Sequence, residues 1–262
     1  MTATNTLIRG QIAFITGASS GIGQAVAQAL ASLGVHLILT ARRASRLEAI
    51  AESLTQEYGV RVLTRVLDVR DQEAVAHCVT SLPADWQSVD ILINNAGLAL
   101  GLSPVQSGDV QLWDQMIDTN IKGLLYVTRA VLPGMLARSA GHVVNLGSIA
   151  GHQVYPNGNV YCASKFAVRA LSEGIKMDVH GTPIRVTEID PGLVETEFSL
   201  VRFAGDAERA KHVYSGMQAL SAEDVAEVIA FCLTRKPHVN IMSVRMYPTD
   251  QSSVQLVHRE EN

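Results

Sequence analysis

The sequence of 262 residues lacks the features of membrane, secreted and metal-binding proteins. It has no run of about 18 apolar residues that could span a bilayer, and its first residues, MTATNTLIRGQ, lack the apolar stretch of a signal peptide. The three cysteines, Cys78, Cys162 and Cys232, show no metal or redox spacing. The histidines are scattered, so we expect no catalytic metal. A reducing, cytoplasmic location fits this cysteine usage.

Charge is also scarce, which limits the class of partner. Charged residues make up 18% of the chain, the formal net charge is −4 and no basic run is present. We therefore expect neither a nucleic-acid partner nor long disordered tails. Hydrophobic residues make up 47%, enough for a sizeable core. The length is typical of one large α/β domain, and we expect a single domain over residues 1–262.

Segments of apolar, β-forming residues alternate with segments of helical periodicity. The expected strands are 12–16, 35–40, 62–69, 89–94, 142–146, 184–189 and 241–247. Several are apolar almost throughout, which is typical of strands buried on both faces of a parallel sheet. Residues 23–33 and 113–137 have helical spacing, Ser221 to Asp224 suggests a capping box, and 195–214 is the least regular region. The pattern predicts an α/β fold, a doubly wound parallel sheet of about seven strands with helices on both faces.

A glycine-rich turn follows the first expected strand directly. Gly17, Gly21 and Gly23 lie in TGASSGIG, between the apolar run IAFIT and a helical segment. Such glycines permit a tight turn and a close approach to a pyrophosphate, and a helix start favours its negative charge. This context predicts a nucleotide-binding loop rather than a simple strand–helix turn.

A tyrosine and a lysine stand at positions i and i+4 of an expected helix. Tyr161 and Lys165 lie in GNVYCASKFAVRALSEG, on one helix face and separated by small residues. A nearby ammonium group favours the phenolate and lowers the pKa of tyrosine. A tyrosine so tuned can donate and accept protons near neutral pH. An amphipathic helix with an exposed lysine would show the same spacing, so the pair needs support from other residues.

That support comes from a resemblance to the short-chain dehydrogenase/reductase family, whose motifs run in order through the chain. TGASSGIG resembles its cofactor loop, NNAG at 94–97 its second motif, and PGLVET at 191–196 its nicotinamide-side motif. Asn120, Ser148, Tyr161 and Lys165 match its catalytic tetrad. The resemblance implies a Rossmann-like fold and hydride transfer between a nicotinamide and a carbonyl or alcohol.

The resemblance also assigns a role to each member of the tetrad. Tyr161 would exchange a proton with the substrate oxygen, and Ser148 would orient that oxygen. Lys165 would hold the nicotinamide ribose and lower the pKa of Tyr161. Asn120 would anchor a water that links Lys165 to solvent. Ser148 could instead cap a turn, and Asn120 could satisfy backbone groups in a kinked helix.

The same motifs give a set of cofactor-binding residues, and the cofactor is expected to be NADP. NAD-preferring relatives commonly carry an aspartate at the position of Ala41, at the end of the second strand. Here Arg42 and Arg43 follow Ala41, and a guanidinium suits a 2′-phosphate. Asp68 would accept a hydrogen bond from the adenine. The full expected set is Gly17, Ser19, Ser20, Gly21, Ile22, Gly23, Arg42, Arg43, Asp68, Val69, Asn95, Ala96, Gly97, Tyr161, Lys165, Pro191, Gly192, Val194 and Thr196.

A narrower resemblance concerns the substrate. INNAGLALG, GNVY and EIDPGLVETEFSLVRFAGD resemble the NADP-dependent 3-hydroxy acid dehydrogenases, a group with serine 3-dehydrogenase and L-allo-threonine dehydrogenase activities. It implies a small hydroxy acid or carbonyl substrate, broad carbonyl reduction and a homotetramer. The substrate-binding residues would be Ser148, Tyr161 and Arg202, which offers a guanidinium to the substrate carboxylate. HQVY at 152–155 departs from some members of the group.

Two alternatives stay open at this point. A 3-oxoacyl reductase that acts on carrier-bound chains would need a basic patch for its acidic carrier, and the sequence has no clear basic cluster. A non-catalytic NADP-sensing protein on the same fold could lose the tyrosine or the lysine, whereas this sequence keeps the whole tetrad.

Overall fold

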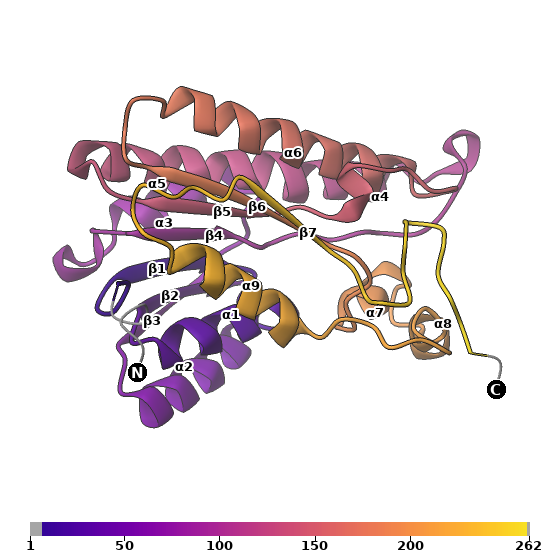
Figure 1. The fold of residues 1–262 in the computed structure, drawn as a ribbon, viewed down its shortest axis with the longest axis horizontal. Helices are drawn as coiled ribbons and strands as arrows, with labels where there is room; N and C mark the ends of the chain where they lie inside the picture. The colour runs from indigo at the N-terminus through magenta and orange to yellow at the C-terminus, as the bar shows by residue number, and fades with distance from the viewer. Residues whose placement is uncertain (1–6, 261–262) are drawn as a thin grey trace.

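A computed structural model of the protein describes residues 7–260. A single parallel sheet of seven strands runs through this part of the chain, in the order β3-β2-β1-β4-β5-β6-β7 (Figure 1). The strands are β1 (Ile12–Thr16), β2 (His36–Ala41), β3 (Val62–Val66), β4 (Ile91–Asn94), β5 (His142–Leu146), β6 (Arg185–Pro191) and β7 (Ser243–Met246). All seven strands predicted from the sequence are present, and the doubly wound parallel sheet is confirmed.

Helices cover both faces of the sheet (Figure 1). One face carries α1 (Gly21–Ser32), α2 (Ala44–Tyr58) and α9 (Ala222–Leu233), and the other carries α3 (Gln72–Thr80), α4 (Val110–Ile117), α5 (Leu124–Arg138) and α6 (Asn159–Asp178). Alternate strand residues feed two separate cores, because successive side chains point to opposite faces. Ile15 and Leu39 pack toward α1 and α9, whereas Phe14 and Leu92 pack toward α5 and α6. The predicted capping box, Ser221 with Asp224, opens α9.

Strand ends account for most differences from the sequence prediction. β3 ends at Val66, whereas the pattern suggested 62–69. Its neighbour β2 ends at Ala41, and the last contact between the two is from Leu67 N to Ala41 O at 3.0 Å. Asp68 therefore lies in a loop beyond the strand. β6, in contrast, continues to Pro191 because β7 still pairs with it there.

The long helix predicted over 113–137 is interrupted. The chain forms α4, then a π-helical turn η4 (Asp118–Gly123), then α5. π-helical turns are often associated with functional sites, and this one contains Asn120. The pattern of apolar residues continues through the turn, so periodicity alone gave no sign of it.

The region 195–214 is more regular than predicted. It contains two short helices, α7 (Phe198–Arg202) and α8 (Ala207–His212). Both lie beyond the carboxyl ends of the strands, next to the final segment of the chain (Figure 1). Three 3₁₀ turns complete the described elements: η2 (Ala84–Trp86), η3 (Val105–Ser107) and η5 (Ile149–Gly151).

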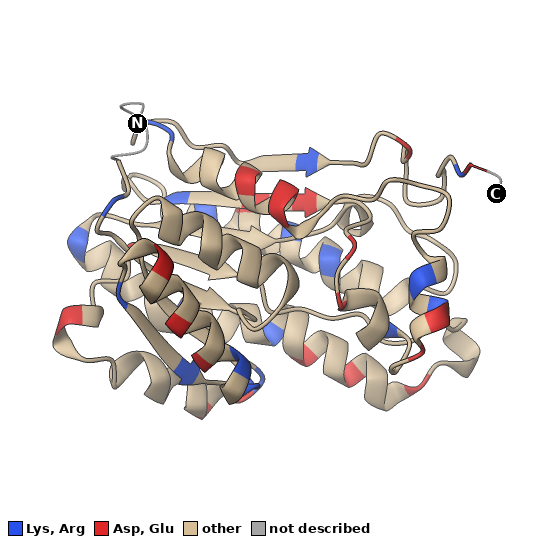
Figure 2. Ribbon diagram, turned by 90° about the horizontal axis from the view of Figure 1, so that it is seen from below, with Lys and Arg blue, Asp and Glu red and all other residues tan. Residues whose placement is uncertain are grey.

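Charged residues of both signs are spread over the helices, strands and loops of the described chain (Figure 2). Within residues 7–260, none of the helices combines the length and the apolar character that a bilayer span requires.

Candidate active site

A cavity of about 480 Å³ lies at the carboxyl ends of the central strands. Strand order reverses between β1 and β4, and in open α/β sheets ligands bind at such a point. Of the residues predicted for the site, Gly23 and Asn120 do not line the cavity. The others do: Gly17, Ser19, Ser20, Gly21, Ile22, Arg42, Arg43, Asp68, Val69, Asn95, Ala96, Gly97, Ser148, Tyr161, Lys165, Pro191, Gly192, Val194, Thr196 and Arg202.

The turn after β1 is shaped to bring backbone close to a ligand. Gly17 has φ +66°, a left-handed conformation that disfavours any residue with a side chain. At Gly23 a Cβ would collide with Gly17 O and with the side chain of Asn95. Asn95 Nδ2 donates to Thr16 O at 2.9 Å and to Gly17 O at 3.1 Å, so it fixes the turn from the end of β4. These features fit a dinucleotide pyrophosphate at the start of α1.

Arg43 makes the contacts at the end of β2. Its guanidinium donates to Ser19 Oγ at 3.0 Å and to Ser20 Oγ at 2.6 Å, which joins β2 to the glycine turn. It also pairs with Glu197 at 2.9 Å. Arg42, expected to be the main phosphate contact, lines the same cavity. Two guanidinium groups therefore stand where a 2′-phosphate is expected.

Asp68 has a charged partner, Arg70, that the sequence analysis did not identify. Its carboxylate pairs with Arg70 Nη2 at 2.6 Å and also accepts from Arg70 Nε. The hydrogen bond from Arg70 is the largest cause that lowers the pKa of Asp68. Asp68 lines the cavity, and its carboxylate is already paired with Arg70.

Ser148 stands at the end of β5 and does cap a turn. Its Oγ accepts from Ala150 N at 3.1 Å, and its own backbone N donates to Asp190 Oδ1 at 3.0 Å. Ser148 and Tyr161 also line the same cavity, and Ser148 lowers the pKa of Tyr161 against the larger effect of burial. Capping the turn therefore does not remove Ser148 from the cavity.

Tyr161 and Lys165 share one face of α6, and both line the cavity. Lys165 Nζ donates to Leu146 O at 2.7 Å and lies 5.9 Å from the centroid of the Tyr161 ring. Burial lowers the pKa of Lys165 to about 8, while the carboxylates of Asp190 and Glu188 oppose this change.

The predicted fall in the pKa of Tyr161 is wrong for this structure. Burial is the largest effect and raises the pKa above its ordinary value, and Tyr155 adds to the rise. Arg202 and Ser148 act against the rise. Lys165 Nζ lies 5.9 Å from the ring centroid and donates to Leu146 O. The phenol is therefore protonated at neutral pH, but its raised pKa makes it a weaker acid than free tyrosine.

Asn120 lies behind the cavity, in the π-helical turn. Its Oδ1 accepts from Leu98 N at 2.9 Å, and its Nδ2 donates to Leu98 O at 2.8 Å and to Ser164 Oγ at 3.0 Å. The side chain thus satisfies backbone groups of the loop after β4, which was the alternative considered from the sequence. It also joins this loop to the middle of α6.

Arg202, in the last turn of α7, lies next to the ring of Tyr161. Its guanidinium carbon lies 5.2 Å from the Tyr161 ring centroid, 5.5 Å from that of Tyr155 and 5.8 Å from that of Phe198. Nη2 donates to Tyr155 Oη. Nε is buried and finds no hydrogen-bond partner among the described residues. A cation therefore lines the cavity beside Tyr161, with one buried donor unused.

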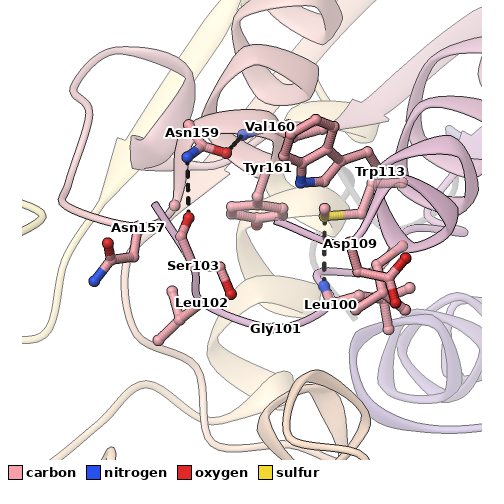
Figure 3. Close-up of a pocket in the computed structure, with 13 residues that line it drawn as sticks. Leu100, Gly101, Leu102, Ser103, Asp109, Trp113, Asn157, Asn159, Val160 and Tyr161 are labelled. Atoms are coloured by element: carbon pink, nitrogen blue, oxygen red, sulfur yellow. Dashed lines mark hydrogen bonds between the residues drawn. The ribbon is translucent and has the colours of Figure 1, made fainter. Parts of the chain in front are cut away.

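A second, much smaller cavity of about 20 Å³ lies against another side of Tyr161. Figure 3 shows the tyrosine ring between the loop 100–103 and Trp113. Asn159 Nδ2 donates to Ser103 O at 3.1 Å and ties this loop to the start of α6. The ring of Tyr161 is thus held from behind while it lines the larger cavity in front.

Several cavity residues were not predicted from the sequence. Tyr155, Glu197 and Phe198 line the cavity, and Asp190 supports Ser148 from below. HQVY at 152–155 had been noted only as a departure from relatives. Glu197 follows the PGLVET motif directly, but its pairing with Arg43 depends on residues 154 positions apart.

Sequence comparison places the chain in a family. The model of the short chain dehydrogenase family matches residues 11–206. Together with the parallel sheet, the glycine turn and the Ser–Tyr–Lys arrangement, this shows that the chain belongs to the short-chain dehydrogenase family.

Its relatives include a more narrowly defined group. The NADP-dependent 3-hydroxy acid dehydrogenase YdfG of Salmonella typhi is 49% identical over 250 residues, which cover 95% of this chain and 99% of that protein. The NADP-dependent 3-hydroxy acid dehydrogenase of Schizosaccharomyces pombe is 44% identical, over 96% of this chain and 98% of that protein.

Among solved structures, the closed form of serine dehydrogenase complexed with NADP⁺ superposes with a TM-score of 0.89. It is 46% identical, and the match covers 95% of this chain and 100% of that one. The predicted family, and within it the likeness to 3-hydroxy acid dehydrogenases, are confirmed.

Proposed function

We propose that the protein transfers hydride between NADP(H) and the 3-hydroxyl or 3-oxo carbon of small hydroxy acids. The observation that carries this proposal is the grouping of Tyr161, Lys165 and Ser148 at one cavity, with the guanidinium of Arg202 5.2 Å from the tyrosine ring centroid. The first three form the proton-transfer apparatus of an alcohol dehydrogenase, and the fourth supplies a cation for an acid. The relatives named as NADP-dependent 3-hydroxy acid dehydrogenases support the same assignment.

NADP is the cofactor that the cavity fits best. The glycine turn would hold the pyrophosphate, Arg42 and Arg43 the 2′-phosphate, and Lys165 the nicotinamide ribose. When bound, NADP(H) supplies the hydride chemistry. Because no carboxylate stands at Ala41, a 2′-phosphate would meet no repulsion there.

The chain's own residues would orient the substrate and move its proton. Ser148 would hydrogen-bond the reacting oxygen. Tyr161 is protonated at neutral pH and would donate that proton to a carbonyl oxygen during reduction. In the oxidative direction Tyr161 must accept that proton, and the positive charges of Lys165 and Arg202 would stabilise the phenolate. Asn120 would hold the loop after β4 against α6. We also propose that it anchors a water that links Lys165 to solvent.

Arg202 would recognise the substrate carboxylate. Its Nε is buried without a partner, and an unsatisfied buried donor costs about 1–3 kcal/mol. A carboxylate could accept from Nε and from a neighbouring N–H of the same fork. Tyr155, which accepts from Nη2, would hold the guanidinium in place.

A substrate screen tests this function directly. Initial rates of NADPH formation would be measured with L-serine and other small 3-hydroxy acids, and rates of NADPH consumption with aldehydes and ketones. We expect 3-hydroxy acids to be oxidised with NADP⁺ and several carbonyl compounds to be reduced. Activity only with carrier-bound 3-oxoacyl chains would favour the reductase alternative, and binding of NADP(H) without turnover of any substrate would favour a sensor.

We also propose a homotetramer in the cytoplasm. Leu125, Leu136, Phe166 and Met177, on α5 and α6, are 39–73% exposed, and these two long helices are the expected contact elements. The described cysteines are free and buried, which suits a reducing compartment. Light scattering coupled to size-exclusion chromatography would give a mass of four chains, and a monomer mass would refute the tetramer.

A further inference from the structure

Two carboxyl groups lie buried beneath the active site. Glu188 and Asp190 are two residues apart on β6, so they point to the same face of the sheet. They are only 3% and 0% exposed. A Cβ at Gly147, just before Ser148, would collide with an oxygen of each carboxyl group. The two acids therefore converge below the backbone that carries the catalytic serine.

Asp190 is surrounded by hydrogen-bond donors. Oδ1 accepts from Ser148 N at 3.0 Å, and Oδ2 accepts from Ser243 Oγ at 3.2 Å and from His152 Nε2 at 3.0 Å. The other ring nitrogen of His152 lies 3.3 Å from Arg169 Nη1, a donor only, so the ring proton belongs on Nε2. Three donors around one carboxyl group indicate an ionised acceptor.

Glu188 has the opposite surroundings. Its Oε1 is buried and has no hydrogen-bond partner within the described residues. Burial first, and then the adjacent Asp190, raise the pKa of Glu188 to about 8, against the opposing charges of Arg169 and Lys165. Two like charges this close cannot both remain ionised in a buried site. A protonated Glu188 can donate its proton to Asp190.

We infer that Glu188 and Asp190 hold one proton between them and act as a positioning pair, in which Asp190 fixes Ser148 and the single remaining negative charge is the buried counter-charge of Lys165. The pair touches neither the cavity nor the substrate. It acts through the backbone of Ser148 and through the protonation state of Lys165.

The position of Lys165 explains why a counter-charge is needed. Its ammonium group is buried and contacts only the carbonyl oxygen of Leu146, at 2.7 Å, among the hydrogen bonds of the described residues. A buried ammonium without a negative charge nearby tends to lose its proton. The carboxylates of Asp190 and Glu188 are the groups that oppose the burial-driven fall in the Lys165 pKa.

Other charged or titratable groups face the pair from each neighbouring element. α6 contributes Lys165 and Arg169, and Arg169 also pairs with Glu173 at 3.5 Å. The turn after η5 contributes His152. Arg245 of β7 stands opposite Asp190 in the strand register but is exposed to solvent. The buried positive charge next to the pair is that of Lys165, which favours one ionised carboxylate rather than none.

The double variant Glu188→Gln/Asp190→Asn tests the counter-charge, in an assay that rests on the proposed dehydrogenase function. It keeps both shapes but removes both carboxyl groups, so neither can take over the charge of the other, and the pKa of Lys165 should fall further. We expect the alkaline limit of the kcat profile to move to lower pH by about one unit or more. Asp85→Asn, which removes an exposed carboxylate paired with Arg61, is the matched control and should keep the profile. An unchanged alkaline limit in the folded double variant would refute the counter-charge.

Glu188→Gln tests the shared proton without any assay of activity. Glutamine matches the shape of protonated glutamic acid, so the variant should fold. Infrared spectra of the parent protein and of Glu188→Gln would be compared at pH 7. The parent protein should show a protonated carboxyl band that is missing in the variant. A band that persists in the variant, or no such band in the parent, would overturn the pair.

Thermal unfolding gives a second readout that is also independent of turnover. Folded Glu188 keeps its proton up to about pH 8, whereas the unfolded chain loses it near the ordinary value of 4.5. Stability of the parent protein should therefore fall relative to Glu188→Gln as the pH rises from about 5 to 7.5. A Tm difference that does not vary with pH would contradict the shared proton. Both readouts stand even if the proposed substrate is wrong.

Discussion

The guanidinium carbon of Arg202 lies 5.2 Å from the centroid of the Tyr161 ring, although the two residues come from α7 and α6. Both side chains line the same cavity. The arrangement places a fixed positive charge beside the phenol that is expected to move the substrate proton. It lowers the cost of forming the phenolate, and it offers a charged partner to a substrate that carries a carboxylate.

Arg202→Ala should therefore discriminate between substrates. We expect kcat/KM for 3-hydroxy acids to fall by roughly 10- to 150-fold, the equivalent of about 1.5–3 kcal/mol for a charge-assisted hydrogen bond. An uncharged aldehyde or ketone should lose much less. Steady-state kinetics with both substrate types on the same variant make the comparison.

Arg209→Ala is the matched control for Arg202. Arg209, on α8, also stacks on an aromatic ring, 4.3 Å from the centroid of Phe203, but it does not line the cavity. It should leave both substrates nearly unaffected. Equal losses for acid and ketone in Arg202→Ala would show that the residue supports the fold of α7 rather than the carboxylate.

Cofactor preference should depend on two arginines in different ways. Arg42→Ala is expected to weaken NADP(H) binding roughly 10- to 150-fold and NAD(H) binding far less, because only the former carries a 2′-phosphate. Arg43→Ala should weaken both, since Arg43 also holds Ser19 and Ser20 of the glycine turn. Fluorescence titration with NADPH and NADH measures both affinities.

Arg46→Ala serves as the control for this pair. Arg46 contacts Glu197 at 2.7 Å, as Arg43 does at 2.9 Å, but it lies outside the cavity. If Arg46→Ala weakened NADPH as much as Arg42→Ala, the loss would come from general charge and not from contact with the phosphate.

The sequence predicted the sheet well because buried parallel strands carry their signal locally. The run 12–16, IAFIT, is apolar except for its last residue, and β1 occupies that range. The run 142–146, HVVNL, has three apolar residues of five and is β5. The spacing of apolar residues did not predict the π-helical turn at Asn120, although a kinked helix there was one reading of that residue. Its side chain binds the backbone of Leu98, 22 residues earlier. The spacing of apolar residues along the chain gives no information about so distant a partner.

The cavity residues divide in the same way. Motif residues such as Gly17 and Lys165 were found because their chemistry requires a fixed spacing. The partners that tune them come from elsewhere in the chain: Arg70 engages Asp68, Tyr155 holds Arg202, and Asp190 supports Ser148. The rise in the pKa of Tyr161 was not predicted for the same reason, since its main causes are burial and Tyr155, which the sequence analysis did not place at the site.

His142 should make the protein sensitive to acid. It is 2% exposed in β5, its Nε2 lies 2.8 Å from Thr187 Oγ1, and burial holds its pKa well below the ordinary 6.5. Below about pH 6.5 His142 binds a proton in the unfolded chain but not in the folded protein. The free energy of unfolding therefore falls as the pH drops. His142→Asn should lose this part of the pH dependence.

Melting temperatures from pH 5 to 8 provide the check. The Tm of the parent protein relative to His142→Asn should decrease as the pH falls below about 6.5. His77→Asn, at an exposed position of α3, is the control and should track the parent protein. Parallel curves for parent and His142→Asn would remove His142 as the source of acid sensitivity.

The most direct test of the account is turnover of NADP⁺ and a small 3-hydroxy acid by Tyr161→Phe. The change deletes the phenolic oxygen and keeps the ring that packs against Phe198, at 5.7 Å between centroids. We predict that kcat falls by at least roughly a hundredfold, the scale of general acid–base catalysis, while NADPH affinity changes little. Turnover within a few-fold of the parent protein would contradict proton transfer by Tyr161 and with it the proposed mechanism.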